Sequence, residues 1–190
     1  APLKIINAFP PPMQYSESPY GVGNSKGSIT SYTHKEKGQH VGPQEILAFH
    51  DYDEGLAYAK KVGKPVFIDF TGHGCQNCRK MEEYVWSDPN IKSILSNDVV
   101  LISLYVDERA ELADSEKYET TLAGKKKKVK TTGDKWMVLQ ANTYGTNSQP
   151  YYVFLHHNEQ QLIEAANYQD YGTVSLFSDW LKRGLKKFKK

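Results

Sequence analysis

The most apolar segments of this chain are three short, continuous runs rich in β-branched and aromatic residues. They cover residues 65–70, 99–106 and 150–155. Runs of this length without polar alternation are typical of strands that are buried on both faces of a sheet. A fourth strand is expected at residues 161–165, returning beside the third after a turn at Asn158.

Apolar residues at helical spacing occupy the segments between these runs. The first such segment extends from Ile46 to Val62, with Pro43 suited to a first turn and Gly63 suited to a helix end. Further helices are predicted from the cysteines to residue 86, from Asp88 onwards, over residues 136–142 and over residues 174–188. The order of these elements predicts an α/β fold with a central mixed β-sheet flanked by helices.

Two segments fall outside this pattern. Residues 1–42 are rich in Gly, Ser, Pro and Tyr without a regular period, and we expect an extended N-terminal tail or linker there. Residues 43–190 form the expected domain. Within it, residues 108–134 include the basic run from Lys125 to Lys130, which predicts a solvated surface insertion. A binding patch for an acidic partner or anionic lipid headgroups is the alternative.

Composition narrows the class of protein. Hydrophobic residues make up 39% and aromatic residues 12% of the chain, which is enough for a packed core. The formal net charge of +2 gives no reason to expect a nucleic-acid partner. No apolar run is long enough to span a bilayer, so the chain as given is expected to be soluble. As a fragment it is also expected to be monomeric.

Both cysteines of the chain lie in one C-x-x-C motif, Cys75-Gln76-Asn77-Cys78. Three interpretations are open. A structural disulfide across so short a loop would contribute only about 2 kcal/mol. A zinc site would have two ligands here and no second pair to complete a tetrahedral set. A redox pair is complete with two cysteines, and this is the interpretation that the spacing favours.

The predicted position of the motif suits thiol–disulfide exchange. The cysteines follow a buried strand and begin a helix, whose unpaired N–H groups and positive dipole end stabilise a thiolate. Cysteines at such positions have pKa values of roughly 3.5–7.5, against about 8.5 for a free cysteine. We expect Cys75 to be the exposed nucleophile and the more buried Cys78 to resolve the mixed disulfide. A protonated His73 would lower the pKa of Cys75 further.

The residues around the motif resemble the active site of the thioredoxin superfamily. Asp69 stands six positions before the first cysteine, where that family has a buried acidic residue. Pro150 precedes a predicted strand, where the family has a cis-proline that faces the cysteines.

The longer string from residue 69 to residue 82 narrows the resemblance. It is similar to the C-terminal periplasmic domain of DsbD-type transmembrane thiol:disulfide interchange proteins, in the form found in Bacteroidetes-like bacteria. In that subfamily a glutamate seven positions after the first cysteine modulates the active site, and Glu82 matches it. The likeness extends over residues 44–188.

This resemblance implies a protein-disulfide reductase that works by thiol–disulfide exchange. Electrons would come from a transmembrane domain of the same parent protein and pass to periplasmic thioredoxin-like or disulfide-bearing acceptors, including those that serve cytochrome c biogenesis. The catalytic set would be Cys75, Cys78, Asp69, Glu82 and Pro150, with no dissociable cofactor and no metal. The chain would be a periplasmic domain of a bacterial inner-membrane protein, and residues 1–42 would follow the membrane domain.

Some features depart from the thioredoxin pattern. Residues 72–74 are Gly-His-Gly where thioredoxins carry a tryptophan, and Gln76-Asn77 replaces Gly-Pro. The reduction potential of thioredoxin can therefore not be assigned to this cysteine pair. A free periplasmic reductase or oxidase with the same fold is therefore an alternative, and a non-enzymatic metal-binding or structural module is another. The predicted site residues also have non-catalytic interpretations: Asp69 would lie in a polar pocket, Glu82 would be a solvated helix residue, and Pro150 would be trans.

Overall fold

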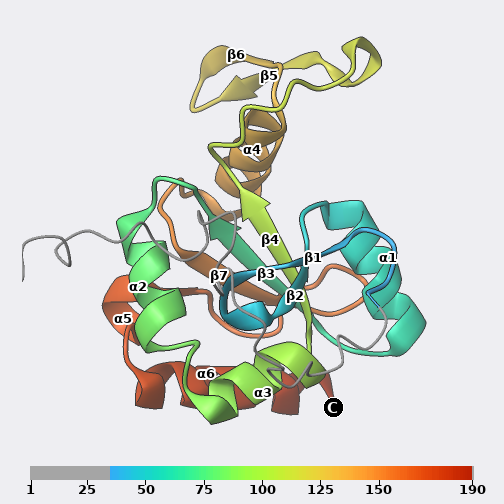
Figure 1. Cartoon of the computed structure of the whole chain (residues 1–190). Helices are drawn as coiled ribbons and strands as arrows, with labels where there is room; N and C mark the ends of the chain where they lie inside the picture. The colour runs from blue at the N-terminus through green and yellow to red at the C-terminus, as the bar shows by residue number, and fades with distance from the viewer. Residues whose placement is uncertain (1–34, 190) are drawn as a thin grey trace, which may run out of the picture. The chain divides into compact units, whose positions relative to one another are not determined.

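A computed structural model describes residues 35–189, so most of the expected N-terminal tail, residues 1–34, lies outside the described residues. The described chain forms a mixed sheet with the strand order β1-β2-β4-β3-β7-β8 and a separate two-stranded hairpin (Figure 1). The strands of the mixed sheet are β1 (Gln39–Val41), β2 (Leu47–Phe49), β3 (Val66–Thr71), β4 (Val100–Tyr105), β7 (Tyr151–Leu155) and β8 (Ala166–Asn167).

β3 is a central strand, and its position explains its composition. It runs parallel to β4 and antiparallel to β7, and all of its residues are buried, as the continuous apolar run predicts. The register places Asp69 beside Ser103 on β4 and beside Tyr152 on β7. Because β3 and β4 are parallel, they end at the same edge of the sheet, and the cysteines follow at that edge.

Helices cover both faces of the sheet (Figure 1). They are α1 (Tyr52–Val62), α2 (Gln76–Tyr84), α3 (Pro89–Asn97), α4 (Thr132–Tyr144), α5 (Tyr168–Tyr171) and α6 (Val174–Phe188), with 3₁₀ turns η3 (Pro43–Glu45) and η4 (Asp114–Glu116). α1 and α4 pack against Ile68 and its neighbours on one face, and α2, α3 and α6 pack against Phe67 on the other. The predicted fold class is confirmed. No helix within residues 35–189 combines the length and hydropathy that a membrane span requires.

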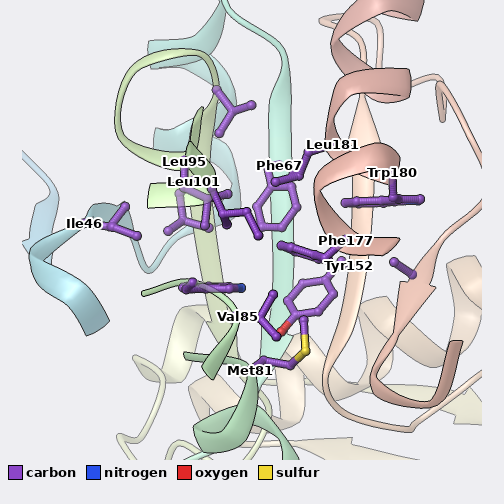
Figure 2. Close-up of a cluster of buried hydrophobic side chains, with 14 of the residues drawn as sticks. Ile46, Phe67, Met81, Val85, Leu95, Leu101, Tyr152, Phe177, Trp180 and Leu181 are labelled. Atoms are coloured by element: carbon purple, nitrogen blue, oxygen red, sulfur yellow. The ribbon is translucent and has the colours of Figure 1, made fainter. Parts of the chain in front are cut away.

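Aromatic rings fill the layer between the sheet and α6 (Figure 2). Met81 and Val85, from α2 and its C-terminal end, belong to the same layer. Burying each of these large side chains contributes roughly 1.5–3 kcal/mol, so the layer holds α2 firmly on the sheet. The ring of Phe67 contacts those of Trp86, Tyr152, Phe154, Phe177 and Trp180.

The helix expected to follow Pro43 begins only at Tyr52, so that prediction is wrong for its first part. Gln44 and Glu45, which lie within the 3₁₀ turn, adopt left-handed backbone conformations with φ of 56° and 61°, and a continuous right-handed helix does not allow these. β2 follows, and Phe49 pairs with β4 instead of extending a helix. From Tyr52 the prediction holds, and Gly63 ends α1 with a φ of 69°.

The strand that returns beside β7 lies later than predicted. Residues 161–165 make a single bridge, between Gln161 and Leu155, and β8 takes the pairing position instead. Glu159 adopts a left-handed conformation with a φ of 66°, in the turn that separates the two strands. The short helix α5, which the apolar pattern does not predict, follows β8 directly.

The segment expected as an insertion contains a β-hairpin and the start of α4. β5 (Tyr118–Leu122) and β6 (Lys125–Val129) pair only with each other in the described chain. The hairpin contacts α4 and projects from the rest of the described residues (Figure 1). α4 begins at Thr132, earlier than predicted, because Thr131 and Asp134 form a capping box there.

Candidate active site

Cys75 and Cys78 are joined by a disulfide bond at the beginning of α2. Cys75 is the N-cap residue, and its Sγ accepts a hydrogen bond from the backbone N–H of Cys78 (3.2 Å). Cys75 is partly exposed, whereas Cys78 is 1% exposed. A thiolate at Cys75 would receive the same donor and the positive end of the helix dipole. The first cysteine is thus accessible and the second is covered, as expected from the sequence.

The carboxylate of Asp107, which follows β4, holds the loop that precedes the cysteines. Its two oxygens accept hydrogen bonds from the backbone N–H groups of His73 (2.8 Å) and Gly74 (3.0 Å). A Cβ on Gly72 would lie only 3.1 Å from Asp107 Oδ2, so a glycine there lets the carboxylate approach. Burial acts to raise the pKa of Asp107, but the two N–H donors, together with the charge of His73, hold it below its ordinary value.

The side chain of His73 is engaged away from the cysteines. Its ring stacks on that of Tyr105, with the ring centres 4.3 Å apart, and its Nε2 lies 3.0 Å from Glu108 Oε2. The hydrogen bond with His73 is the main reason that the pKa of Glu108 lies below its ordinary value. A positive charge on His73 would be balanced first by Glu108, which weakens the hypothesis that it acts on Cys75.

Asp69 is buried in β3, on the face of the sheet that α2 and α6 cover. It is 3% exposed, its Oδ2 accepts a hydrogen bond from Ser103 Oγ (3.3 Å), and its Oδ1 has no hydrogen-bond partner. Burial first, and the charge of Glu82 second, raise the pKa of Asp69 well above its ordinary value. Asp69 is therefore a carboxylic acid that retains its proton at a pH where exposed aspartates are ionised.

Glu82 is a second buried carboxyl group, one helical turn after Cys78. It is 5% exposed, so it is not a solvated helix residue. Burial raises its pKa to about 7, although the positive charge of Arg79 acts in the opposite direction. A carboxyl group with this pKa changes its protonation state close to neutral pH, which is what proton transfer to and from a thiol requires.

Arg79 joins this group, although the C-x-x-C motif and the resemblance do not indicate it. Its Nη2 donates a hydrogen bond to Glu82 Oε1 (2.8 Å) and another to Thr71 Oγ1 (3.3 Å). The ion pair is poorly exposed, with 24% of the arginine side chain and 7% of the glutamate side chain accessible. The i, i+3 spacing of the two residues on a helix is the signal that could have indicated the pair.

Pro150 lies at the edge of the sheet where β3 ends. The Gln149–Pro150 peptide bond is cis, as the resemblance implies, and Pro150 is buried. Tyr151, the next residue, pairs with Phe70 in the register of β7 against β3. Because β3 continues into the loop that carries Cys75, this register places Pro150 at the same edge as the cysteines.

A fully buried glutamine on α4 holds the loop before Pro150. Gln140 Nε2 donates a hydrogen bond to the carbonyl oxygen of Ser148 (2.8 Å), and Gln140 Oε1 accepts one from Gln149 Nε2 (2.8 Å). The sequence pattern gives no indication of this contact, because a glutamine in a helix is ordinarily exposed.

Residues 35–189 contain no group of three or more His, Cys, Asp or Glu side chains arranged to hold a metal ion. The two cysteines are bonded to each other. The groups described above for this site include two sulfur atoms, two buried carboxyl groups and one guanidinium group.

Comparisons with known proteins agree with this geometry. A family model described as thioredoxin-like matches residues 45–156. The thiol:disulfide interchange protein DsbD of Salmonella typhi is 36% identical over 62 residues, which are 33% of this chain and 11% of that protein. DsbD of Escherichia coli K12 is 33% identical over 70 residues, which are 36% of this chain and 12% of that protein.

A solved structure of DsbH oxidoreductase matches with a TM-score of 0.53 at 19% identity, over 80% of this chain and 95% of that one, which shows the fold. The match to the curated relatives spans 11% to 12% of their length. The family model covers more than half of this chain and includes the bonded cysteine pair. The chain therefore belongs to the thioredoxin-like family, and part of it is similar to the thiol:disulfide interchange protein DsbD.

Proposed function

We propose that this domain is a protein-disulfide reductase that relays electrons from a transmembrane domain of the same parent protein to periplasmic acceptors. The observation that carries the proposal is the Cys75–Cys78 disulfide, which lies between a buried strand and a helix N-terminus, with two buried carboxyl groups in the layer beneath. The similarity to DsbD supports two parts of this proposal, namely that the electron donor is a transmembrane domain and that the domain is periplasmic.

The reaction has two exchange steps. In the reduced domain the thiolate of Cys75 attacks one sulfur of the acceptor disulfide, and the other acceptor sulfur leaves with the electron pair and takes up a proton. Cys78 then loses its proton and attacks Cys75, which releases the second acceptor thiol and forms the disulfide seen in this structure. The acceptor gains two electrons, and the domain must receive two from its donor before the next cycle.

The buried carboxyl groups serve the proton steps of this cycle. Cys78 is covered and has to be deprotonated before it can attack. Asp69 and Glu82, whose pKa values burial raises, are the acidic groups in the same layer and would exchange protons with the thiols. The backbone around Pro150 would hold the acceptor chain beside Cys75 in an extended conformation.

Two single substitutions test the assignment of the cysteines. We expect Cys75→Ser to abolish reduction of a protein disulfide by the pre-reduced domain, because the attacking thiolate is lost. Cys78→Ser should instead accumulate a mixed disulfide between Cys75 and the acceptor, detectable by mass spectrometry. Disulfide-reductase activity that survives in Cys75→Ser would refute the proposed nucleophile.

The direction of electron flow is tested by the reduction potential of the Cys75–Cys78 pair. A value near that of thioredoxin, about −270 mV, would support a reductant, and a value near that of DsbA, about −120 mV, would identify an oxidase instead. Stoichiometric zinc bound to the reduced protein would contradict both exchange functions.

A further inference from the structure

Arg79 lies beside Glu82 and the end of β3, and its charge also acts on Asp69. Its guanidinium group donates to Glu82 on its own helix and to Thr71, the last residue of β3. Its Nε is buried without a hydrogen-bond partner. An arginine held in this way gives up much of its hydration. This loss indicates that the role of its positive charge is to stabilise its ion-pair partner, Glu82.

Arg79 forms the only ion pair of Glu82 among residues 35–189. The other titratable groups whose charges act on this pair and its neighbours are acidic or phenolic, and their charged forms are all negative. They are Asp69 from β3, Glu83 from α2, Tyr105 from β4 and Tyr152 from β7. Without the guanidinium group, an ionised Glu82 would have no partner in a buried, acidic environment.

Glu82 is also the carboxyl group nearest along α2 to the buried cysteine. Cys78 and Glu82 are four residues apart, and both lie on the buried face of the helix. Glu82 shares this helix face with Cys78 and is paired with a cation, whereas Asp69 lies on β3, and we therefore assign proton acceptance to Glu82.

We propose that Arg79 is a positioning residue for the exchange reaction, which holds Glu82 ionised and in place so that Glu82 takes the proton of Cys78 in the resolving step. This inference rests on the proposed function, because it concerns a step of that reaction. The proton moves from Cys78 Sγ to a carboxylate oxygen of Glu82, and the Cys78 thiolate then displaces the acceptor sulfur from Cys75.

The two exchange steps can be observed separately with dithiobis(nitrobenzoate) as the probe. The Cys75 thiolate of the reduced domain attacks one sulfur of the probe and releases a first thionitrobenzoate. Cys78 then attacks Cys75, and the Cys75–Cys78 disulfide forms as a second, coloured thionitrobenzoate leaves. The first phase reports Cys75 alone, and the pH profile of the second phase reports the deprotonation of Cys78.

We expect Arg79→Gln to shift the pH midpoint of the second phase upward by about one unit, since a nearby opposite charge lowers a carboxyl pKa by one to three units. At neutral pH the second phase should be roughly three- to tenfold slower. The titration midpoint of the Glu82 carboxyl in the disulfide form, followed by carbon NMR, should rise by a similar amount, and this readout needs no exchange activity.

Matched variants separate this role from a structural one. Arg79→Lys retains the charge and should restore most of the wild-type midpoint. Lys80→Gln removes one positive charge from the next position of α2, where Nζ lies over the ring of Tyr168 (5.7 Å), and should leave the profile unchanged. In a Glu82→Gln background, Arg79→Gln should cause no further shift of the midpoint.

The outcomes distinguish the two proposals. A domain whose Cys75 fails to react in the first phase contradicts the proposed function. A normal first phase, together with a second-phase midpoint that is the same in Arg79→Gln as in the wild type, overturns the role of Arg79. A shift that persists in the Glu82→Gln background also overturns it, because Arg79 would then act on the thiols directly. If Arg79→Gln does not fold, Arg79→Met, which retains much of the aliphatic chain, is compared in its place.

Discussion

Asp69 introduces a carboxyl group into a layer that is otherwise filled by large apolar side chains such as Phe67 and Tyr152. One of its oxygens has a hydroxyl donor and the other has none. Burying a polar group without full hydrogen bonding costs about 1–3 kcal/mol, so this residue lowers the stability of the domain. A cost of this kind is typical of groups retained for their chemistry.

The destabilisation caused by burying Asp69 depends on pH, and the direction of this dependence follows from its raised pKa. The pKa of Asp69 in the folded chain is raised well above that of an exposed aspartate, so the folded chain binds a proton that the unfolded chain releases. The contribution of Asp69 to stability is fully present below the unfolded pKa and is lost as the pH rises towards the folded pKa. Asp69→Asn should remove this loss, and its unfolding free energy should exceed that of the wild type by on the order of 1–3 kcal/mol at mildly alkaline pH.

Urea unfolding of the disulfide form at several pH values checks this prediction. Asp98→Asn, which changes an exposed aspartate, is the matched control and should follow the wild type. If Asp69→Asn and the wild type differ by the same amount at every pH, then the burial of an ionisable group is not the cause.

The sequence predicts the parts of the site that depend on spacing along the chain. The C-x-x-C motif and the offset of Asp69 identify the cysteines and the buried acid. Arg79 and Gln140 are not predicted, because their contacts with Thr71 and Ser148 arise only when a helix packs beside a strand end or a loop. A pattern of residue types carries no information on such contacts unless both partners lie within one helical turn.

At the scale of elements, the segment before α1 shows that a strand region can have the apolar spacing of a helix. Ile46 and Phe49 are three residues apart and both buried, which is the spacing of one helical face. They form part of a strand region because β2 finds partners on both sides, in β1 and in β4. The second of these partners lies far along the sequence, so local periodicity cannot reveal it.

The approach of α6 to β7 depends on a glycine within the helix. A Cβ on Gly184 would lie 2.5 Å from Cδ2 of Phe154, a ring that is itself fully buried. Alanine favours a helix over glycine by about 1 kcal/mol, but overpacking a buried contact costs about 1–3 kcal/mol.

We therefore expect Gly184→Ala to lower the unfolding free energy despite its better helix propensity. Thermal or urea unfolding measures the change, and Ser175→Ala, at an exposed position of the same helix, should alter stability by less than about 0.5 kcal/mol. A stabilised Gly184→Ala would mean that α6 can move away from the sheet without loss of packing.

At the scale of the whole molecule, the β5–β6 hairpin is separate from the sheet that carries the cysteines. Its strands pair only with each other in the described chain, and Tyr118 and Val129 pair at its base. We expect that replacing residues 119–128 by Asn-Gly, a favoured two-residue hairpin turn, changes the unfolding free energy by no more than about 1 kcal/mol.

Unfolding of the shortened chain and its reaction with a small disulfide provide the test. Cys75 should react at the wild-type rate, because the hairpin contributes none of the contacts described for the site. A full-length variant with Lys125 and Lys126 changed to Gln separates the loss of charge from the loss of the hairpin. Loss of cooperative unfolding in the shortened chain would show that the hairpin is part of the core.

The sheet also separates the tryptophans of the domain, which lie on its two faces. The chain has three tryptophans; Trp86 and Trp180 lie in the layer under α6, and Trp136 lies in the layer under α1 and α4. In a chain that carries phenylalanine in place of Trp136, the tryptophan emission would come from one side of the sheet alone. Intrinsic fluorescence can then distinguish on which side of the sheet water first enters when the disulfide is opened or the domain begins to unfold.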